Sequence, residues 1–311
     1  MKIRKQTRTL LYILVFSFFL VAVVPRYDQL VVGIKEIKNA DIFWLTAAIL
    51  SFVLTFVSSA LVYLLLAKRR LKLSKTILVQ VACPFANRLL PGGFGGVGLN
   101  IDYLIKNKHK PEQATSVVAM NSSVAFVSHM LLLCIAVVLS RSSVTNLFYQ
   151  RSYFLLIVAL IFLLLLSIST FVIHIVPSIN KKLSKFMRGS WRSFVSYKSN
   201  LGNVILAVGV ASITTMFYVF CLFACANALG LSISLVQAFL VYTVAVALGA
   251  ILATPGGLGS FEAGLFAGLI AYHNFPALAF SVIITFRLII FWLPILPGYV
   301  AFAVLRRRKV I

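Results

Sequence analysis

Long apolar runs alternate along the chain with short polar stretches, and the lengths of the runs predict helices that cross a membrane. A hydrocarbon core of about 30 Å is spanned by roughly 20 helical residues. The runs that meet or approach this length are Leu10–Val24, which is short, Ile42–Ala67, Ala114–Leu139, Tyr153–Val176, Val204–Leu229 and Ala277–Leu305. We therefore predict an all-α polytopic membrane protein with about six full transmembrane helices. The first run lacks a small-residue cleavage site, so we expect an uncleaved span rather than a signal peptide.

Two further apolar runs are interrupted near their middle by the same three residues. Thr76–Ile105 breaks at Pro91, Gly92 and Gly93, and Leu235–Tyr272 breaks at Pro255, Gly256 and Gly257, with Gly259 close behind. Proline and glycine interrupt helices, and broken helices at membrane depth are tolerated where protein lines the turn. The runs are short for two full spans each, so we predict two re-entrant helical hairpins. Pro294 and Pro297 similarly interrupt the last span, as a hinge or a tolerated kink.

Composition supports a membrane protein, and the placement of charge predicts its orientation. Hydrophobic residues make up 61% of the 311 residues and charged residues only 11%, which excludes an ordinary soluble enzyme. The formal net charge is +23, and most Lys and Arg residues fall in the N-terminal tail, the C-terminus and the loops around 68–75, 106–110 and 181–198. By the positive-inside rule these segments are cytoplasmic, as are both termini. Basic residues spread over one membrane side do not favour nucleic acid.

This topology gives the chain two halves of opposite orientation within one membrane domain, residues 1–311. Residues 42–139 read span, hairpin, span, and residues 204–305 repeat that order from the other side of the membrane. Inverted repeats with matching broken helices are typical of transporters with a site near the midplane. Between the halves, residues 181–200 show one apolar and one basic face, which predicts an interfacial helix on the cytoplasmic leaflet, or else a solvated linker helix.

Three charged residues lie inside apolar segments, where charge is costly and indicates function. Arg88 precedes the first tip, Glu262 follows the second, and Arg287 lies within the last span. Two guanidinium groups suit a phosphate, since each offers a planar fork of donors. Glu262 is open to three roles: pairing with an arginine, binding a cationic headgroup, or carrying a proton. The structural alternative is an Arg–Glu pair that only fixes helix register.

Polar residues beside the tips complete the candidate site. Asn87 flanks the first tip and is suited to hydrogen-bond its backbone, while Asn121 lies in an unusually polar third span. For Asn121, interhelical hydrogen bonding is the favoured interpretation over substrate binding. We find no catalytic constellation, no metal-ligand spacing and no cofactor motif, and so expect no enzyme activity, no metal and no cofactor.

The tips resemble those of a known family. Residues 254–264, TPGGLGSFEAG, are similar to the motif of the lysylphosphatidylglycerol synthase transmembrane, or flippase-like, family. Residues 87–96, NRLLPGGFGG, resemble its other signature, and residues 287–294, RLIIFWLP, its last conserved span. The resemblance implies a lipid translocator. The aminoacyl-transferase domain of well-known members has no counterpart after the last basic residues, so a stand-alone translocator is expected. The uncharged stretch Val118–Ser122 departs from the family pattern and leaves the aminoacyl-lipid substrate open.

These observations favour a lipid flippase of the prokaryotic plasma membrane. Its substrate would be an anionic or aminoacylated phospholipid, or a polyprenyl-phosphate-linked lipid, held in a groove between the two hairpins. The main alternative is a non-catalytic membrane subunit that partners a glycosyltransferase or another lipid-modifying enzyme. A small-solute transporter is a third hypothesis. Membrane lipids that carry phosphate are the expected partners, and a second copy of the chain or a lipid-modifying enzyme stays open as a protein partner.

Overall fold

The computed structural model describes residues 40–89, 94–139, 195, 197, 200–251, 259–272 and 276–311. Every regular element among them is a helix. Four of these helices are long and apolar enough to cross a membrane: Ile42–Leu66, Pro111–Ala136, Leu201–Ala228 and Pro276–Arg307. They coincide with four of the six predicted spans. The spans predicted at Leu10–Val24 and Tyr153–Val176, and nearly all of the interfacial helix at 181–200, lie outside the described residues, so the count of six stays a prediction.

Both interrupted runs form pairs of short helices, as predicted. The first run gives α4, Leu73–Leu89, and α5, Phe94–Lys106, and the second gives α10, Leu235–Ile251, and α11, Ser260–Tyr272. Helices of 13 to 17 residues extend only about 20 to 25 Å at 1.5 Å per residue, less than the hydrocarbon core. Their length therefore agrees with helices that do not cross it completely.

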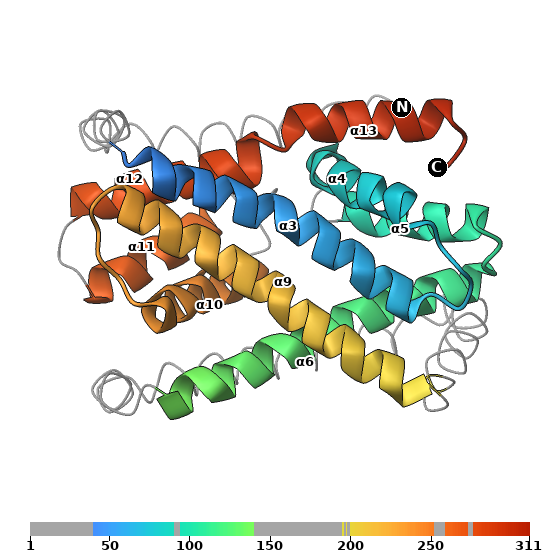
Figure 1. The fold of residues 1–311 in the computed structure, drawn as a ribbon, viewed down its shortest axis with the longest axis horizontal. Coiled ribbons are helices and arrows are strands. Elements are labelled where there is room, and N and C mark those ends of the chain that lie inside the picture. The colour runs from blue at the N-terminus through green and yellow to red at the C-terminus, as the bar shows by residue number, and fades with distance from the viewer. Residues whose placement is uncertain are drawn as a thin grey trace, which may run out of the picture. The chain divides into compact units, whose positions relative to one another are not determined.

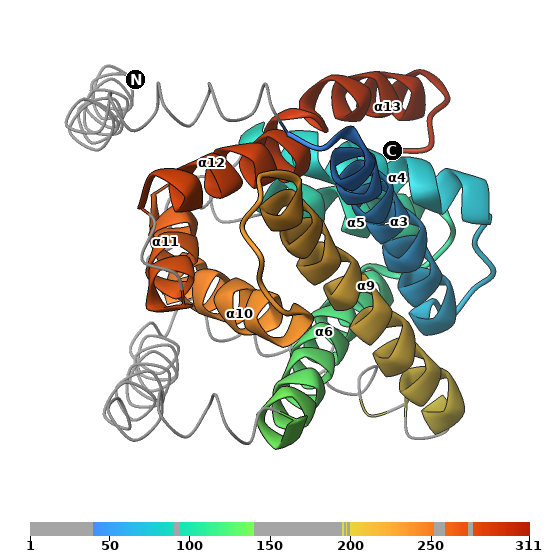
Figure 2. The same cartoon turned by 60° about the vertical axis from the view of Figure 1, so that its left-hand side comes forward.

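The helices of each pair run antiparallel. In the first pair, Gly96 near the start of α5 bonds Asn87 near the end of α4. Farther along α5, the Tyr103 hydroxyl bonds Thr76 near the start of α4. In the second pair, α10 and α11 lie side by side (Figure 2). A Cβ added at Gly264 would lie 2.5 Å from the Ala245 Cα, which shows how closely the two backbones approach. The small residues of Gly264-x-x-x-Gly268 allow this approach.

The last span is not one continuous helix. It consists of α12, Pro276–Arg287, a π-helical segment η5, Leu288–Trp292, and α13, Ile295–Arg307 (Figure 1). Within the break the Leu293 N–H donates to the Leu288 carbonyl at 2.8 Å, five residues back instead of four. Pro294 has no N–H to continue the ladder. The interruption predicted from the prolines is therefore present, and it directly follows Arg287.

The described residues form two compact units. The first contains the start of α3, Ile42–Leu66, the residues on both sides of the first tip, the end of α9, Leu201–Ala228, and the elements from α10 to Ala303. Aromatic contacts order its interior, since the Tyr218 and Tyr242 rings stack at 5.9 Å and the Phe261 and Phe286 rings at 6.4 Å. This unit contains Arg88, Glu262 and Arg287.

The second unit has its own apolar core. Among its fully buried members are Leu66 from α3, Leu104 from α5, Val117 from α6, Pro111–Leu139, and Ala207 from α9. Ser128 on α6 and Ser212 on α9 share a hydrogen bond of 3.0 Å. This bond is of the interhelical kind that the polar residues of the third span indicated.

Candidate functional site

Arg287 and Glu262 form an ion pair inside the first unit. The Arg287 Nε donates to the Glu262 Oε1 at 2.5 Å, and the two side chains keep only 11% and 27% of their exposure. Arg287 is the last residue of α12, where the π-helical break begins, and Glu262 lies in the first turn of α11. Of the roles open to Glu262, the structure therefore shows the pairing with an arginine. The pair joins the second hairpin to the last span.

The second carboxylate oxygen of Glu262 caps its own helix. The Gly259 N–H donates to Glu262 Oε2 at 2.8 Å, while the Gly259 carbonyl accepts from the Ala263 N–H at 2.9 Å. This is the helix-end arrangement in which a glutamate three residues into the helix bonds the capping residue. Gly259 has a φ of +88°, a conformation that glycine adopts at little cost. Both oxygens of Glu262 are thus occupied by groups of the protein.

Arg88 is held in a different way, by neutral groups. Its guanidinium donates to the main-chain carbonyls of Pro84 and Phe291, and its Cζ lies 4.1 Å from the centroid of the Phe291 ring. Its Nε is buried and has no hydrogen-bond partner among the described residues. Within the part of the chain that the structure describes, no carboxylate pairs with Arg88. Its positive charge is therefore not neutralised there.

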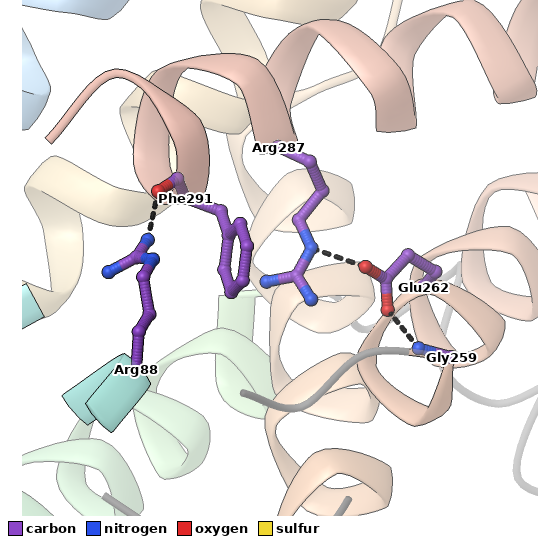
Figure 3. A network of polar contacts seen from close by, with 5 residues as sticks. All are labelled: Arg88, Gly259, Glu262, Arg287 and Phe291. Carbon is purple, nitrogen blue, oxygen red and sulfur yellow. Dashed lines mark hydrogen bonds and ion pairs between the residues drawn. The ribbon is translucent and has the colours of Figure 1, made fainter. Parts of the chain in front are cut away.

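The Phe291 ring lies between the two guanidinium groups, as Figure 3 shows. The Arg287 Cζ is 4.8 Å from its centroid, so both arginines contact the ring within the range of cation–π attraction. Phe291 belongs to the π-helical segment, and such segments often occur at functional sites. Phe291 in the helix break thus contacts both arginines. Arg88 contacts its carbonyl and its ring, and Arg287 contacts its ring.

Asn87 ties the two arms of the first hairpin together close to the tip. Its Oδ1 accepts a hydrogen bond of 2.6 Å from the Gly96 N–H in the first turn of α5. It therefore bonds the backbone beside the tip, as the sequence indicated, and satisfies an N–H that the helix itself leaves unpaired. The tip residues Pro91, Gly92 and Gly93, and likewise Pro255, Gly256 and Gly257, lie outside the described residues.

Asn121 is not part of this arrangement. It lies on α6 in the second unit, whereas Asn87, Arg88, Glu262 and Arg287 belong to the first. The structure therefore brings together Arg88, Glu262 and Arg287 in one network of polar and cation–π contacts, and places Asn87 one residue from Arg88.

Two features of the network were not predicted from the sequence. Phe291 was not recognised, although its spacing of four residues from Arg287 would bring the two together on a helix. The cap at Gly259 was also missed, although Gly-x-x-Glu directly after a helix-breaking tip is close to a capping-box pattern. The capping pattern would have shown in advance that one Glu262 oxygen serves the backbone.

Counted over the described residues, the network carries an excess of one positive charge, because two guanidinium groups face one carboxylate. A charge in apolar surroundings attracts a counter-charge more strongly than it would in water. Arginine donors in a fixed planar fork suit phosphate or carboxylate oxygens. The arrangement is therefore suited to an anionic ligand.

A comparison with protein families gives this network a context. The model of the lysylphosphatidylglycerol synthase TM region matches residues 9–298, nearly the whole chain. The chain belongs to this family. The match includes both hairpins, the capped start of α11 and the broken last span up to Gly298. Together with the long apolar helices, it identifies a multi-pass membrane protein. No curated protein matches the chain.

Proposed function

We propose that this member of the lysylphosphatidylglycerol synthase TM region family translocates a phosphate-bearing lipid across the membrane. The observation that carries the proposal is the network of Arg88, Phe291, Arg287 and Glu262, which has excess positive charge. The network connects three elements: α4 close to the first tip, the second hairpin and the broken last span. Charged groups at membrane depth are retained for function, and broken helices are where transporters bind substrate.

In this proposal the headgroup phosphate binds at the arginines while the acyl chains stay in the bilayer. Three elements converge on the network, and each is interrupted: α4 ends near the first tip, α11 starts after the second, and α12 gives way to η5. In transporters with discontinuous helices, one repeat moves against the other around a fixed site, and such a movement would alter access to the phosphate from either side. The protein moves the lipid without converting it chemically. It lies in a prokaryotic plasma membrane with both termini in the cytoplasm.

Translocation is tested with the purified protein in vesicles that contain a fluorescent phosphatidylglycerol. Chemical quenching from outside measures how much labelled lipid has reached the outer leaflet. We expect faster exchange than in protein-free vesicles, and loss of most of that gain in Arg88→Gln. The matched control is Arg306→Gln, an equal change of charge at an exposed residue near the end of α13.

Equal rates with and without the wild-type protein, at matched incorporation, would overturn the proposal. The alternative of a non-catalytic subunit would then gain support if a lipid-modifying enzyme remained bound during gentle purification. A gain in exchange that Arg88→Gln leaves unchanged would support translocation but remove the network from it.

A further inference from the structure

The two arginines of the network have different interaction partners. This difference indicates that they have different functions. Arg287 has a carboxylate partner, whereas the described partners of Arg88 are two carbonyls and a ring. Both arginines are ionised donors, but the Glu262 carboxylate adds the attraction of an opposite full charge at Arg287, which a neutral carbonyl does not supply at Arg88. An incoming phosphate would therefore replace the carbonyl partners of Arg88 more easily than it would replace Glu262 at Arg287.

The Glu262 carboxylate has a further reason to stay in place. Removing it from Arg287 would strand a charge in apolar surroundings and would also disturb the cap at Gly259. At Arg88 an anion meets the opposite situation. Its positive charge lacks a counter-charge, and its buried Nε still lacks an acceptor among the described residues.

We propose that Arg88 is the phosphate-recognition residue and that the network selects a lipid headgroup with a single net negative charge. This inference rests on the proposed function and names its substrate class. With the Arg287–Glu262 pair intact, one phosphodiester charge at Arg88 brings the network to neutrality. A zwitterionic headgroup would leave the excess charge, and a cationic aminoacylated headgroup would increase it.

Glu262 is a positioning residue in this arrangement rather than a receptor for an amine. An ammonium group on the lipid would have to share the carboxylate with the Gly259 N–H and the Arg287 guanidinium, which already donate to its two oxygens, and it would be repelled by the charge of Arg287. Phe291 is a second positioning residue, because its ring separates the two guanidinium groups and its carbonyl orients Arg88.

The test is a headgroup series in native mass spectrometry of the full chain in detergent. Phosphatidylglycerol, phosphatidylethanolamine and lysylphosphatidylglycerol with identical acyl chains carry net charges of −1, 0 and +1. Competed in equal amounts, phosphatidylglycerol is expected to be retained about tenfold over phosphatidylethanolamine. Both lipids offer Arg88 the same phosphodiester, but the ammonium group of phosphatidylethanolamine would bring a second positive charge close to the excess charge of the network. In Arg88→Gln this preference should disappear, whereas Arg88→Lys should keep part of it.

A second variant shifts the charge in the other direction. Glu262→Gln raises the network from one to two excess positive charges and should move the preference toward phosphatidic acid, whose phosphomonoester carries about −1.5 to −2 charges. Asp102→Asn is the matched control, because Asp102 pairs at 3.4 Å with Lys106 outside the network and both side chains are exposed. A merely structural role for Glu262 would lower binding of all lipids without changing their order.

The outcomes separate this inference from the proposed function. An excess of soluble glycerol phosphate should not displace phosphatidylglycerol, and displacement would indicate a soluble anion as the ligand. Preference for the zwitterionic or aminoacylated lipid, or an order that Arg88→Gln leaves unchanged, would overturn the inference even if vesicles show translocation. Conversely, if the headgroup series shows charge selection at Arg88 but the vesicles show no translocation, the inference is supported and the proposed flippase function is wrong.

Discussion

Glu262 accepts the Nε–H of Arg287 with one carboxylate oxygen while its other oxygen caps the helix on which it lies. One side chain thus links the start of α11 to the end of α12. Because the two interactions use different oxygens, substitutions can remove them separately. The position therefore allows a direct measurement of what each interaction contributes.

Substitution of Glu262 should lower stability in two steps. Glu262→Gln keeps an acceptor for the Gly259 N–H but loses the ion pair, and we expect a cost on the order of 2–3 kcal/mol, below that of a fully buried pair because Glu262 keeps 27% exposure. Glu262→Ala also loses the cap, which adds about 1 kcal/mol. Thermal unfolding in detergent should give the order wild type, Glu262→Gln, Glu262→Ala.

The double variant Glu262→Gln with Arg287→Met provides the control for this order. It removes the unpaired charge that Glu262→Gln leaves behind, and replacing both partners of an ion pair is less harmful than removing one. We expect it to be more stable than Glu262→Gln. Equal stability of wild type and Glu262→Ala would show that neither interaction contributes.

The approach of α4 and α5 is closest at Gly95. A Cβ at Gly95 would lie 1.9 Å from the Ala86 carbonyl oxygen, and the backbone on both sides leaves no flexible group to move. Gly95→Ala should therefore separate the helices and destabilise the protein by about 2 kcal/mol or more, as overpacking does. Thermal unfolding measures the change.

Gly98 on the same helix is the matched control. A Cβ there meets nothing within 4 Å, so Gly98→Ala should be neutral or stabilising by up to about 1 kcal/mol. Similar destabilisation by both alanines would mean that helix propensity or detergent effects, not the contact with Ala86, determine the outcome.

The positions of the helices could be predicted from the sequence because apolar run length decides them. The four described spans and both interrupted runs agree with the expected ranges within a few residues. Arg88, Arg287 and Glu262 could be selected from the sequence because charged residues are rare in apolar segments, and the structure joins them in one network. The length of an apolar run does not tell which group accepts a hydrogen bond from each arginine. The Phe291 carbonyl accepts from Arg88 in a helix break whose hydrogen bonding arises from tertiary context.

Asn121 shows where the sequence argument is weakest. Polar side chains in a transmembrane helix suit a substrate site and an interhelical contact equally, and spacing alone does not distinguish them. On the same helix, Ser128 bonds Ser212 across to α9, and Asn121 lies in a different unit from the charged network. Charged residues are more informative than amides because their desolvation cost is higher.

A buried histidine in the loop before α6 predicts a pH dependence of stability. His109 is 3% exposed, its Nδ1–H donates to the Leu104 carbonyl at 3.0 Å, and its Nε2 has no partner among the described residues. Burial lowers the pKa of His109 below its ordinary value of 6.5; the nearby charges of Arg69 and Lys68 add to this, while the hydrogen bond to Leu104 opposes it. The neutral imidazole is therefore the form that the folded protein favours.

The sign of the effect follows from proton uptake. Below about pH 6.5 the unfolded chain binds a proton at His109 that the folded protein binds less readily, so stability falls as the pH decreases from there. In His109→Gln this contribution should vanish, and the decrease in melting temperature between pH 7.5 and 5 should become smaller than in the wild type. An identical decrease in both proteins would assign the pH dependence to other groups.

The central claim is that a lipid phosphate binds at Arg88, and native mass spectrometry of the gently purified chain with its endogenous lipids tests it most directly. Wild type, Arg88→Ala, Arg287→Ala and the surface control Arg306→Ala would be compared at equal folding, monitored by melting temperature. We predict that wild type and Arg306→Ala retain an anionic phospholipid, that Arg88→Ala loses it, and that Arg287→Ala retains it less than the control does. Retention of the same lipid by folded Arg88→Ala and Arg287→Ala at the wild-type level would contradict the claim.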